Sequence, residues 1–302
     1  MDFEFTQEQL ALRAELREYF GKLITPEVRD LDEGSTGYKE VIRQMGTDGW
    51  LGVGWPKEYG GHGHTALEQF IFADEGQRAR APQPGLALAA VGPALMQFGT
   101  DEQKARFLPA ILKGELQIAI GYSEPGAGTD LAALSTRAVR DGDEYVINGQ
   151  KIFTTIADYA DYVWLATRTD PDAPKHKGIS MFLVDTTLPG FSYTPIDTLV
   201  GHRTFATYYQ DVRVPATALV GQENEGWKLI TAQLNLERSG IGSSRRLLDA
   251  IRDVRLWCQE TKDQDDTRLI DKEWVRLTLA RVTAKVHALY ILNLKVAWSG
   301  TQ

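Results

Sequence analysis

The chain has 302 residues, with 43% apolar and 25% charged side chains, which is ordinary for a globular protein of two or three domains. Its formal net charge of −8 argues against a nucleic-acid partner and against an anionic membrane surface. No apolar run reaches the roughly 18–20 residues that cross a bilayer, and residues 1–5 are acidic where a secretory signal is basic. The single cysteine, Cys258, cannot form an internal disulfide, so a reducing, cytoplasmic location is predicted.

The first part of the chain, residues 1–120, has mainly helical patterns. Thr6 and Gln9 have the spacing of a capping box, and apolar residues follow them at helical intervals. Residues 50–64 contain five glycines and a proline, which predicts a loop. Further helices are predicted over residues 65–80, 85–98 and 101–113.

The middle part, residues 121–225, changes to short β-type runs. These runs cover residues 138–140, 145–148, 162–168, 179–184 and 208–214. Asp141-Gly142 and Asn148-Gly149 are dipeptides typical of hairpin turns. We therefore expect an all-β middle domain.

The last part, residues 226–302, returns to the helical period. A polar stretch, residues 259–267, predicts a loop before a long apolar helix over about 271–298. One face of this helical hairpin would stay uncovered unless another chain packs there, or else it rests on the first domain. The fold class is α+β, and this third domain is expected to be truncated, so residues 1–302 could be a fragment.

A glycine-rich segment, residues 121–133, stands between the helical and the β parts. Its glycines allow the backbone to approach a flat or anionic ligand, and Ser123 and Thr129 add hydroxyl groups. From composition alone, a simple interdomain connector explains the segment better.

The whole string GYSEPGAGTDLAA nevertheless resembles the signature of the acyl-CoA dehydrogenases, and the resemblance extends over nearly all of the chain. Further matching motifs follow in the family's order, at residues 55–61, 99–104, 147–151, 211–215 and 236–238. The resemblance implies an N-terminal helical domain, a middle β-barrel-like domain and a C-terminal helical bundle. It also implies a flavoenzyme that desaturates acyl-CoA thioesters.

The resemblance implies FAD as the cofactor, with binding positions at Tyr122, Ser123, Gly128, Thr129, Phe153 and Thr155. Ser123 matches a hydroxyl that hydrogen-bonds the flavin, and the backbone N–H of Tyr122 matches another donor. Tyrosine is a departure there, because the family usually has a small aliphatic residue. Thr129 matches a hydroxyl near the FAD pyrophosphate and the pantetheine arm of coenzyme A. Phe153 matches an aromatic packed against the flavin and Thr155 a hydroxyl near flavin N5, although alone both would be ordinary strand residues.

The reaction that the family carries out needs a base for the α-proton of the thioester, and this base is typically a glutamate in an apolar pocket. One family position for it lies on the first helix after the β domain, which is matched by Glu237 in residues 234–238. The resemblance makes Arg238 a residue that steadies the site, and we expect Asn235 at the pantetheine arm. The simpler alternative for Glu237 is an exposed helix residue paired with a neighbour.

The expected partners come from the same resemblance. Most homo-oligomeric relatives carry an Arg-x-x-Phe-Gly motif that reaches the FAD pyrophosphate of a neighbouring subunit. Residues 262–266 read Lys-Asp-Gln-Asp-Asp here, and two carboxylates would repel a pyrophosphate. Actinobacterial enzymes of steroid side-chain β-oxidation pair two unlike subunits, and residues 267–271 look closest to their glutamate-bearing subunit. An unlike subunit in a heterotetramer is thus expected, with a homo-oligomer as the alternative.

We therefore expect a substrate among the CoA thioesters of steroid side chains and an electron-transfer flavoprotein as acceptor. An acyl-CoA oxidase, or a non-catalytic scaffold subunit of a heteromeric dehydrogenase, remains as an alternative. The five histidines show no zinc spacing, so no metal is expected.

Overall fold

The computed structural model describes residues 4–199, 201, 203–238 and 244–300, and it leaves out the side chains of residues 236–238. The chain forms two compact units, each built from separated stretches of sequence. Unit 1 consists of Met1–Asp32, Gly52–Gln83 and Ser239–Gln302, and unit 2 consists of Glu33–Leu51 and Pro84–Arg238.

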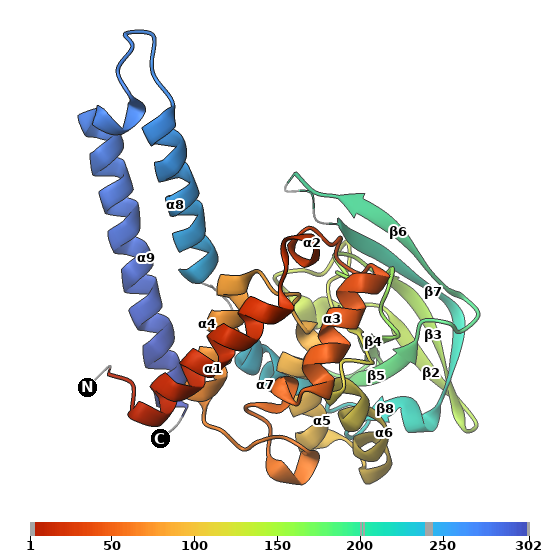
Figure 1. Ribbon diagram of the computed structural model, residues 1–302. Helices are drawn as coiled ribbons and strands as arrows, with labels where there is room; N and C mark the ends of the chain where they lie inside the picture. The colour runs from red at the N-terminus through yellow and green to blue at the C-terminus, as the bar shows by residue number, and fades with distance from the viewer. Residues whose placement is uncertain (1–3, 200, 202, 239–243, 301–302) are drawn as a thin grey trace. The chain divides into compact units, whose positions relative to one another are not determined.

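Unit 1 is helical. Its helices are α1 (Gln7–Leu23), α2 (Pro26–Arg29), α4 (Ala66–Ala79), α8 (Ser244–Glu260) and α9 (Glu273–Ser299) (Figure 1). The short 3-10 turns η2 (Lys57–Tyr59) and η6 (Leu269–Asp271) connect them. The predicted capping box is confirmed, since the Thr6 hydroxyl accepts from the Gln9 N–H and the Gln9 amide accepts from the Thr6 N–H. Phe20 of α1 packs against Phe72 of α4 with ring centroids 5.7 Å apart, which places the apolar faces of both helices in one core.

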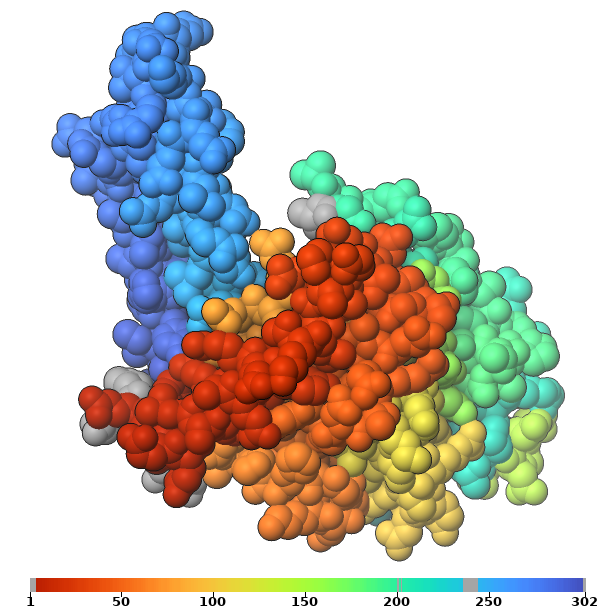
Figure 2. Space-filling view, viewed as in Figure 1, coloured from red at the N-terminus to blue at the C-terminus, as the bar shows by residue number. Residues whose placement is uncertain are grey.

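Helices α8 and α9 form an antiparallel hairpin with its loop over the predicted residues (Figure 1). Much of its apolar surface, blue in Figure 2, is open to solvent. The side chains more than 40% exposed on these two helices are Leu247, Val254, Leu256, Trp257, Trp274, Leu277, Val282, Ile291, Leu292 and Val296. These side chains lie on the hairpin for which the sequence analysis left two alternatives open, a face covered by another chain or a face resting on the first domain.

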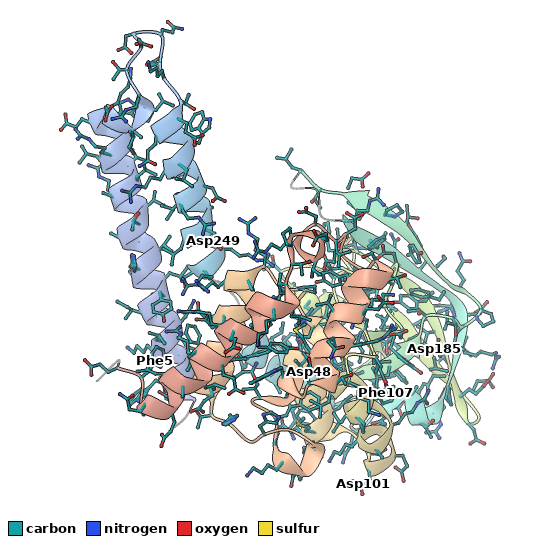
Figure 3. All side chains as sticks on the ribbon, in the orientation of Figure 1. Phe5, Asp48, Asp101, Phe107, Asp185 and Asp249 are labelled. Carbon is teal, nitrogen blue, oxygen red and sulfur yellow. The ribbon has the colours of Figure 1, made fainter. Side chains whose placement is uncertain are left out.

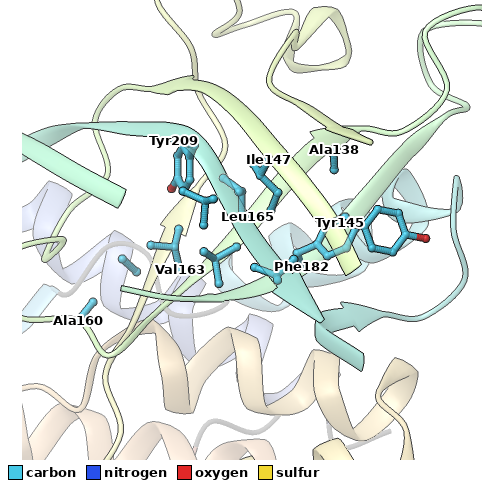
Figure 4. Close-up of a cluster of buried hydrophobic side chains, with 12 residues drawn as sticks. Ala138, Tyr145, Ile147, Ala160, Val163, Leu165, Phe182 and Tyr209 are labelled. Carbon is cyan, nitrogen blue, oxygen red and sulfur yellow. The ribbon is translucent and has the colours of Figure 1, made fainter. Parts of the chain in front are cut away.

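Unit 2 is built around an eight-stranded sheet. Seven strands follow the order β6-β7-β3-β2-β4-β5-β8, and the eighth, β1, pairs with β4. The strands are β1 (Ile118–Gly121), β2 (Arg137–Asp141), β3 (Glu144–Lys151), β4 (Tyr162–Arg168), β5 (Ile179–Asp185), β6 (Phe191–Asp197), β7 (Arg203–Pro215) and β8 (Leu219–Val220). Its core fills with side chains that alternate along these strands, including Val163, Leu165 and Tyr209 (Figure 4). Tyr145 meets Phe182 edge to face, with ring centroids 4.9 Å apart.

Helices complete unit 2 around this sheet. They are α3 (Thr36–Thr47), the π-helical turn η3 (Ala87–Val91), α5 (Gly92–Phe98), α6 (Asp101–Leu112) and α7 (Gly226–Arg238). Three further 3-10 turns are η1 (Trp50–Gly52), which spans the boundary between the two units, η4 (Leu131–Ala133) and η5 (Ala216–Ala218). Gln103 of α6 donates from its side-chain amide to the backbone oxygens of Thr217 and Leu219, both at 2.8 Å. This contact ties α6 to the segment that precedes α7.

Two sequence predictions need correction. Asn148-Gly149 is not a turn, because both residues lie inside β3, at a register shift in its pairing with β7. The Asn148 side chain spans this bulge, donating to the Asp211 carboxylate and accepting from the Asp211 N–H. Strand β6 was missed because it contains Pro195, which lacks a backbone donor and is tolerated here at an edge of the sheet.

Among the residues that the structure describes, no helix combines the length and the apolar character needed to cross a membrane.

Candidate flavin and acyl-CoA site

The signature segment begins where β1 ends at Gly121. This strand runs parallel to β4, with Gly121 opposite Leu165. A Cβ atom on Gly121 would lie 2.9 Å from side-chain carbons of both Val163 and Leu165, so any larger residue would force these buried side chains to move. The chain then closes a tight turn, in which Glu124 and Ala127 exchange two backbone hydrogen bonds of 2.8 and 3.1 Å.

The carboxylate of Glu124 is buried and fully engaged by donors. It accepts from the Ser135 N–H and hydroxyl at 2.7 Å, from the Thr136 N–H at 2.8 Å and from the Lys151 ammonium at 2.8 Å. Burial opposes ionisation, but the Lys151 charge and these donors outweigh it and lower the pKa of Glu124 to about 2. Glu124 is therefore a charged structural anchor at neutral pH.

Lys151, at the end of β3, is the counterpart of this anchor and is 0% exposed. Burial lowers its pKa to about 8, against the opposing attraction of Glu124, so it is ionised at neutral pH. Its ammonium also donates to the backbone oxygen of Tyr122 at 3.0 Å. The next residue, Ile152, donates from its N–H to the Ser123 oxygen at 2.8 Å. Residues 122, 123 and 124 are thus each fastened to residues 151–152.

Three further residues of the signature segment are open to solvent. Gly126, Gly128 and Thr129 are exposed, and a Cβ atom on either glycine would meet no atom within 4 Å. Ser123 is half-buried beside its two anchored neighbours. A fixed backbone that ends in exposed glycines leaves its N–H groups accessible to a ligand.

The chain after β3 turns two side chains outward. Phe153 is 63% exposed and has a φ of 60°, which is rare for a bulky residue. Thr154 points inward, where its N–H donates to the Phe205 oxygen at 2.9 Å and its hydroxyl lies 3.3 Å from that of Thr207. Thr155 is exposed again. The backbone therefore presents an aromatic ring and a hydroxyl at positions 153 and 155, at a local conformational penalty on the order of 1–3 kcal/mol.

The side chain of Tyr122 links this segment to α7. Its phenol donates to Gln233 Oε1 at 2.9 Å and accepts from the Trp164 indole N–H at 3.0 Å. Gln233 is 0% exposed and precedes Glu237 by four residues, which is one helical turn. This hydrogen-bond chain connects β4, the signature segment and the helix that carries the predicted base.

Comparison with protein-family models gives three consecutive matches. The N-terminal domain model of acyl-CoA dehydrogenases matches residues 6–115, the middle-domain model residues 119–228 and the C-terminal domain model residues 224–302. The chain belongs to the acyl-CoA dehydrogenase family. The predicted family and fold class are confirmed, and the protein is an oxidoreductase.

Individual acyl-CoA dehydrogenases are similar over almost the whole chain. Acyl-CoA dehydrogenase FadE26 of Mycobacterium tuberculosis is 54% identical over 309 residues, which cover 99% of this chain and 77% of FadE26. A chain in the crystal structure of the ChsE4-ChsE5 complex from the same organism is 56% identical, with a TM-score of 0.91 over 99% of this chain and 78% of that one. The solved Tcur3481-Tcur3483 steroid acyl-CoA dehydrogenase has 50% identity and a TM-score of 0.89, at 99% and 78% coverage.

The predicted substrate-side residues of this acyl-CoA dehydrogenase are only partly described. Helix α7 extends to Arg238, and Asn235 is exposed on it. The side chains of Glu237 and Arg238 lie outside the described residues, so their predicted roles stay predictions. The next described residue, Ser244, begins α8.

Sequence reasoning missed Glu124, Lys151, Trp164 and Gln233 as supports of the segment. A lysine inside a strand was the available signal for Lys151, since a buried lysine needs a carboxylate partner. Tyr122 was noticed as a departure from the family, but only its backbone N–H was assigned. No pattern in the sequence points to Gln233, because its partner is 111 residues away.

Proposed function

We propose that this chain is the glutamate-bearing subunit of an FAD-dependent acyl-CoA dehydrogenase that desaturates a CoA thioester between Cα and Cβ. The observation that carries the proposal is the anchoring of Tyr122, Ser123 and Glu124 to residues 151–152. It holds the family's signature segment rigidly while leaving its glycines open. Membership of the acyl-CoA dehydrogenase family implies FAD as the cofactor.

The described residues fit a flat, anionic cofactor. The exposed ring of Phe153 offers an aromatic surface, Thr155 offers a hydroxyl two residues away, and Gly126 and Gly128 leave the backbone accessible. We propose that Tyr122, Ser123, Gly128, Thr129, Phe153 and Thr155 hold FAD, with Thr129 also near the pantetheine arm. When bound, FAD supplies the acceptor for the hydride that leaves Cβ.

In this proposal Glu237 is the base that removes the α-proton. Its carboxylate would accept the α-proton, and hydrogen bonds to the thioester oxygen would stabilise the developing enolate charge. Arg238 would steady the site and Asn235 would contact the pantetheine arm. The buried Gln233, one turn earlier on α7, supports a fixed position for the backbone that carries Glu237.

We further propose a heteromeric assembly acting on CoA esters of steroid side chains, since the ChsE4-ChsE5 complex and the Tcur3481-Tcur3483 steroid enzyme are among the similar structures. The loop between α8 and α9 supports this. Lys262, where homo-oligomeric relatives have arginine, donates to Asp266 at 2.8 Å and is thereby engaged within its own loop. Asp266 has a φ of 62°, which suits the glycine of the family motif.

The aspartates of the same loop form ion pairs with lysines of the loop. Asp263 and Asp265 both contact the Lys272 ammonium and Asp266 contacts Lys262, so two ammonium groups partly offset three carboxylates within the loop. The engagement of Lys262 then adds to the remaining carboxylate repulsion in disfavouring a pyrophosphate contact in a twin subunit. We also propose an electron-transfer flavoprotein as acceptor and, given one free buried cysteine, a reducing cytoplasmic setting.

The proposal is tested by flavin reduction. The protein, purified with its unlike subunit and loaded with FAD, is mixed anaerobically with a steroid side-chain acyl-CoA while the flavin absorbance is followed. We expect bleaching by the wild type, a loss of at least a hundredfold in rate for Glu237→Gln, and wild-type rates for the exposed control Glu260→Gln. Near wild-type bleaching by Glu237→Gln would assign the base elsewhere.

A further inference from the structure

Unit 1 contains a pocket of about 430 Å³ between α1, α2, α4 and α8. Its lining includes the carboxylates of Glu75 and Asp249 and the six arginines Arg17, Arg29, Arg78, Arg80, Arg245 and Arg252. Six guanidinium groups and two carboxylates therefore line it, although the whole chain has a net charge of −8. Asp249 is labelled on α8 in Figure 3.

Part of this positive charge has a structural purpose. Asp74 and Glu75 of α4 are buried, with side chains only 3% and 1% exposed. Arg13 and Arg245 reach Asp74 at 2.8 and 2.9 Å, and Arg17 reaches Glu75 through two hydrogen bonds of 3.1 and 2.7 Å. These pairs satisfy the two buried acids and join α1, α4 and α8.

The remaining four arginines exceed what the nearby acids neutralise. Arg80 and Arg252 share Asp253 at 3.3 and 3.2 Å, and Arg252 also reaches Asp249 at 3.2 Å. Arg78 lies 3.7 Å from Glu75, which two hydrogen bonds from Arg17 already engage. Arg29 has no carboxylate within ion-pair distance among the described side chains.

The charge count leaves a clear surplus. When Arg13, Asp74 and Asp253 are added to the lining, seven guanidinium groups face four carboxylates, a surplus of three positive charges. Like charges gathered in a concave site repel one another and raise the local potential, so an anion that enters gains from both effects. Guanidinium groups also match phosphate oxygens through paired N–H donors.

The volume and the apolar lining atoms of the pocket fit a small organic molecule. A volume of about 430 Å³ lies within the range of small-molecule sites. Phe20 and Ala79 contribute apolar atoms, and a Cβ atom on Gly21 would meet nothing within 4 Å. We propose that this pocket binds a small organic phosphate with at least two negative charges, of the size of a nucleoside diphosphate. All of its residues belong to unit 1, whereas the signature segment and its supports belong to unit 2.

The test is calorimetric titration of the protein with ADP, with inorganic pyrophosphate and with adenosine at low and at physiological salt. We expect saturable binding of ADP and pyrophosphate that weakens with salt, and none of adenosine. The double variant Arg29→Gln/Arg252→Gln should weaken ADP binding at least tenfold. The matched control Arg276→Gln/Arg281→Gln removes two exposed arginines from α9 and should change it less than twofold.

Three results of the titrations described above would overturn the proposal. They are absence of ADP and pyrophosphate binding at low salt, adenosine binding as tightly as ADP, or equal effects of the two double variants. Because Arg29 has an exposed side chain without a described ion-pair partner, Arg29→Glu should leave the thermal midpoint unchanged. That variant keeps the test decisive if the double variant fails to fold, and wild-type ADP affinity in Arg29→Glu would also reject the site.

Discussion

The phenol of Tyr122 donates a 2.9 Å hydrogen bond to the side chain of Gln233, across 111 residues of sequence. The same oxygen accepts from the indole of Trp164, so one hydroxyl joins the signature segment, the sheet and α7 inside a buried environment. A small aliphatic side chain at position 122 could not form this link, because it has no hydroxyl group.

Tyr122→Phe should remove this link while keeping the ring. Gln233 and Trp164 each lose a buried hydrogen bond, so we expect the free energy of unfolding to fall by about 1–3 kcal/mol. If the link also positions the proposed base, kcat should fall while KM stays nearly constant. Tyr208→Phe is the control, since Tyr208 lies on β7 with its ring half-buried. Equal effects of the two changes on denaturant midpoints would contradict the role of the Tyr122 hydroxyl.

Glu124→Gln should destabilise the protein strongly. It leaves the ammonium of Lys151, which is 0% exposed, without its counter-charge, and such a loss typically amounts to about 3–5 kcal/mol. Lys151→Met should have a similar effect. The double variant should lose less unfolding free energy than the two single variants lose when their losses are added. Strictly additive free energies of unfolding would argue against a coupled pair.

The same carboxylate predicts a pH dependence. Its pKa in the folded protein is lowered from 4.5 to about 2, so the unfolded chain binds its proton more readily. The stabilisation from Glu124 is therefore complete above about pH 4.5 and is lost as the pH falls toward 2. The free energies of unfolding of the wild type and of Glu124→Gln, measured by denaturant titration, should therefore converge as the pH falls through this interval. A difference that stays constant down to pH 2 would contradict the assignment.

Phe153→Gly should separate stability from flavin binding. Glycine adopts the φ of 60° without strain, so the apoprotein should keep its unfolding free energy within about 1 kcal/mol. Loss of the ring should nevertheless reduce FAD retention at least tenfold under the proposed function. Val139→Gly, at an exposed position inside β2, should instead lower stability by about 1 kcal/mol and leave FAD retention unchanged. Full FAD retention by Phe153→Gly would remove Phe153 from the proposed site.

Rebuilding the family motif tests the heteromeric assembly. The triple variant Lys262→Arg/Asp265→Phe/Asp266→Gly restores the Arg-x-x-Phe-Gly pattern, and glycine suits the positive φ at position 266. If this loop is what prevents like subunits from binding FAD together, the triple variant expressed alone should retain more FAD per chain than the wild type expressed alone. The flavin-to-protein absorbance ratio measures this. A wild-type chain that carries one FAD per subunit without a partner would contradict the proposed heteromeric assembly.

The sequence alone was sufficient for the family and for most elements. Capping residues such as Thr6 and the short apolar run within residues 162–168 are local signals, and the ordered motifs identify the family because each is a contiguous string. Strand β6 and the bulge at Asn148-Gly149 were missed because an edge position and a cross-strand partner, rather than local propensity, decide them.

Only the tertiary structure decided how the signature segment is held. Lys151 and Glu124 are 27 residues apart, Tyr122 and Gln233 are 111 apart, and Arg245 meets Asp74 across 171 residues. The sequence specifies the residue types that can form such pairs. Whether they meet depends on which helices and strands pack together, because a buried charge or hydroxyl must find its partner within hydrogen-bond distance wherever the fold brings one.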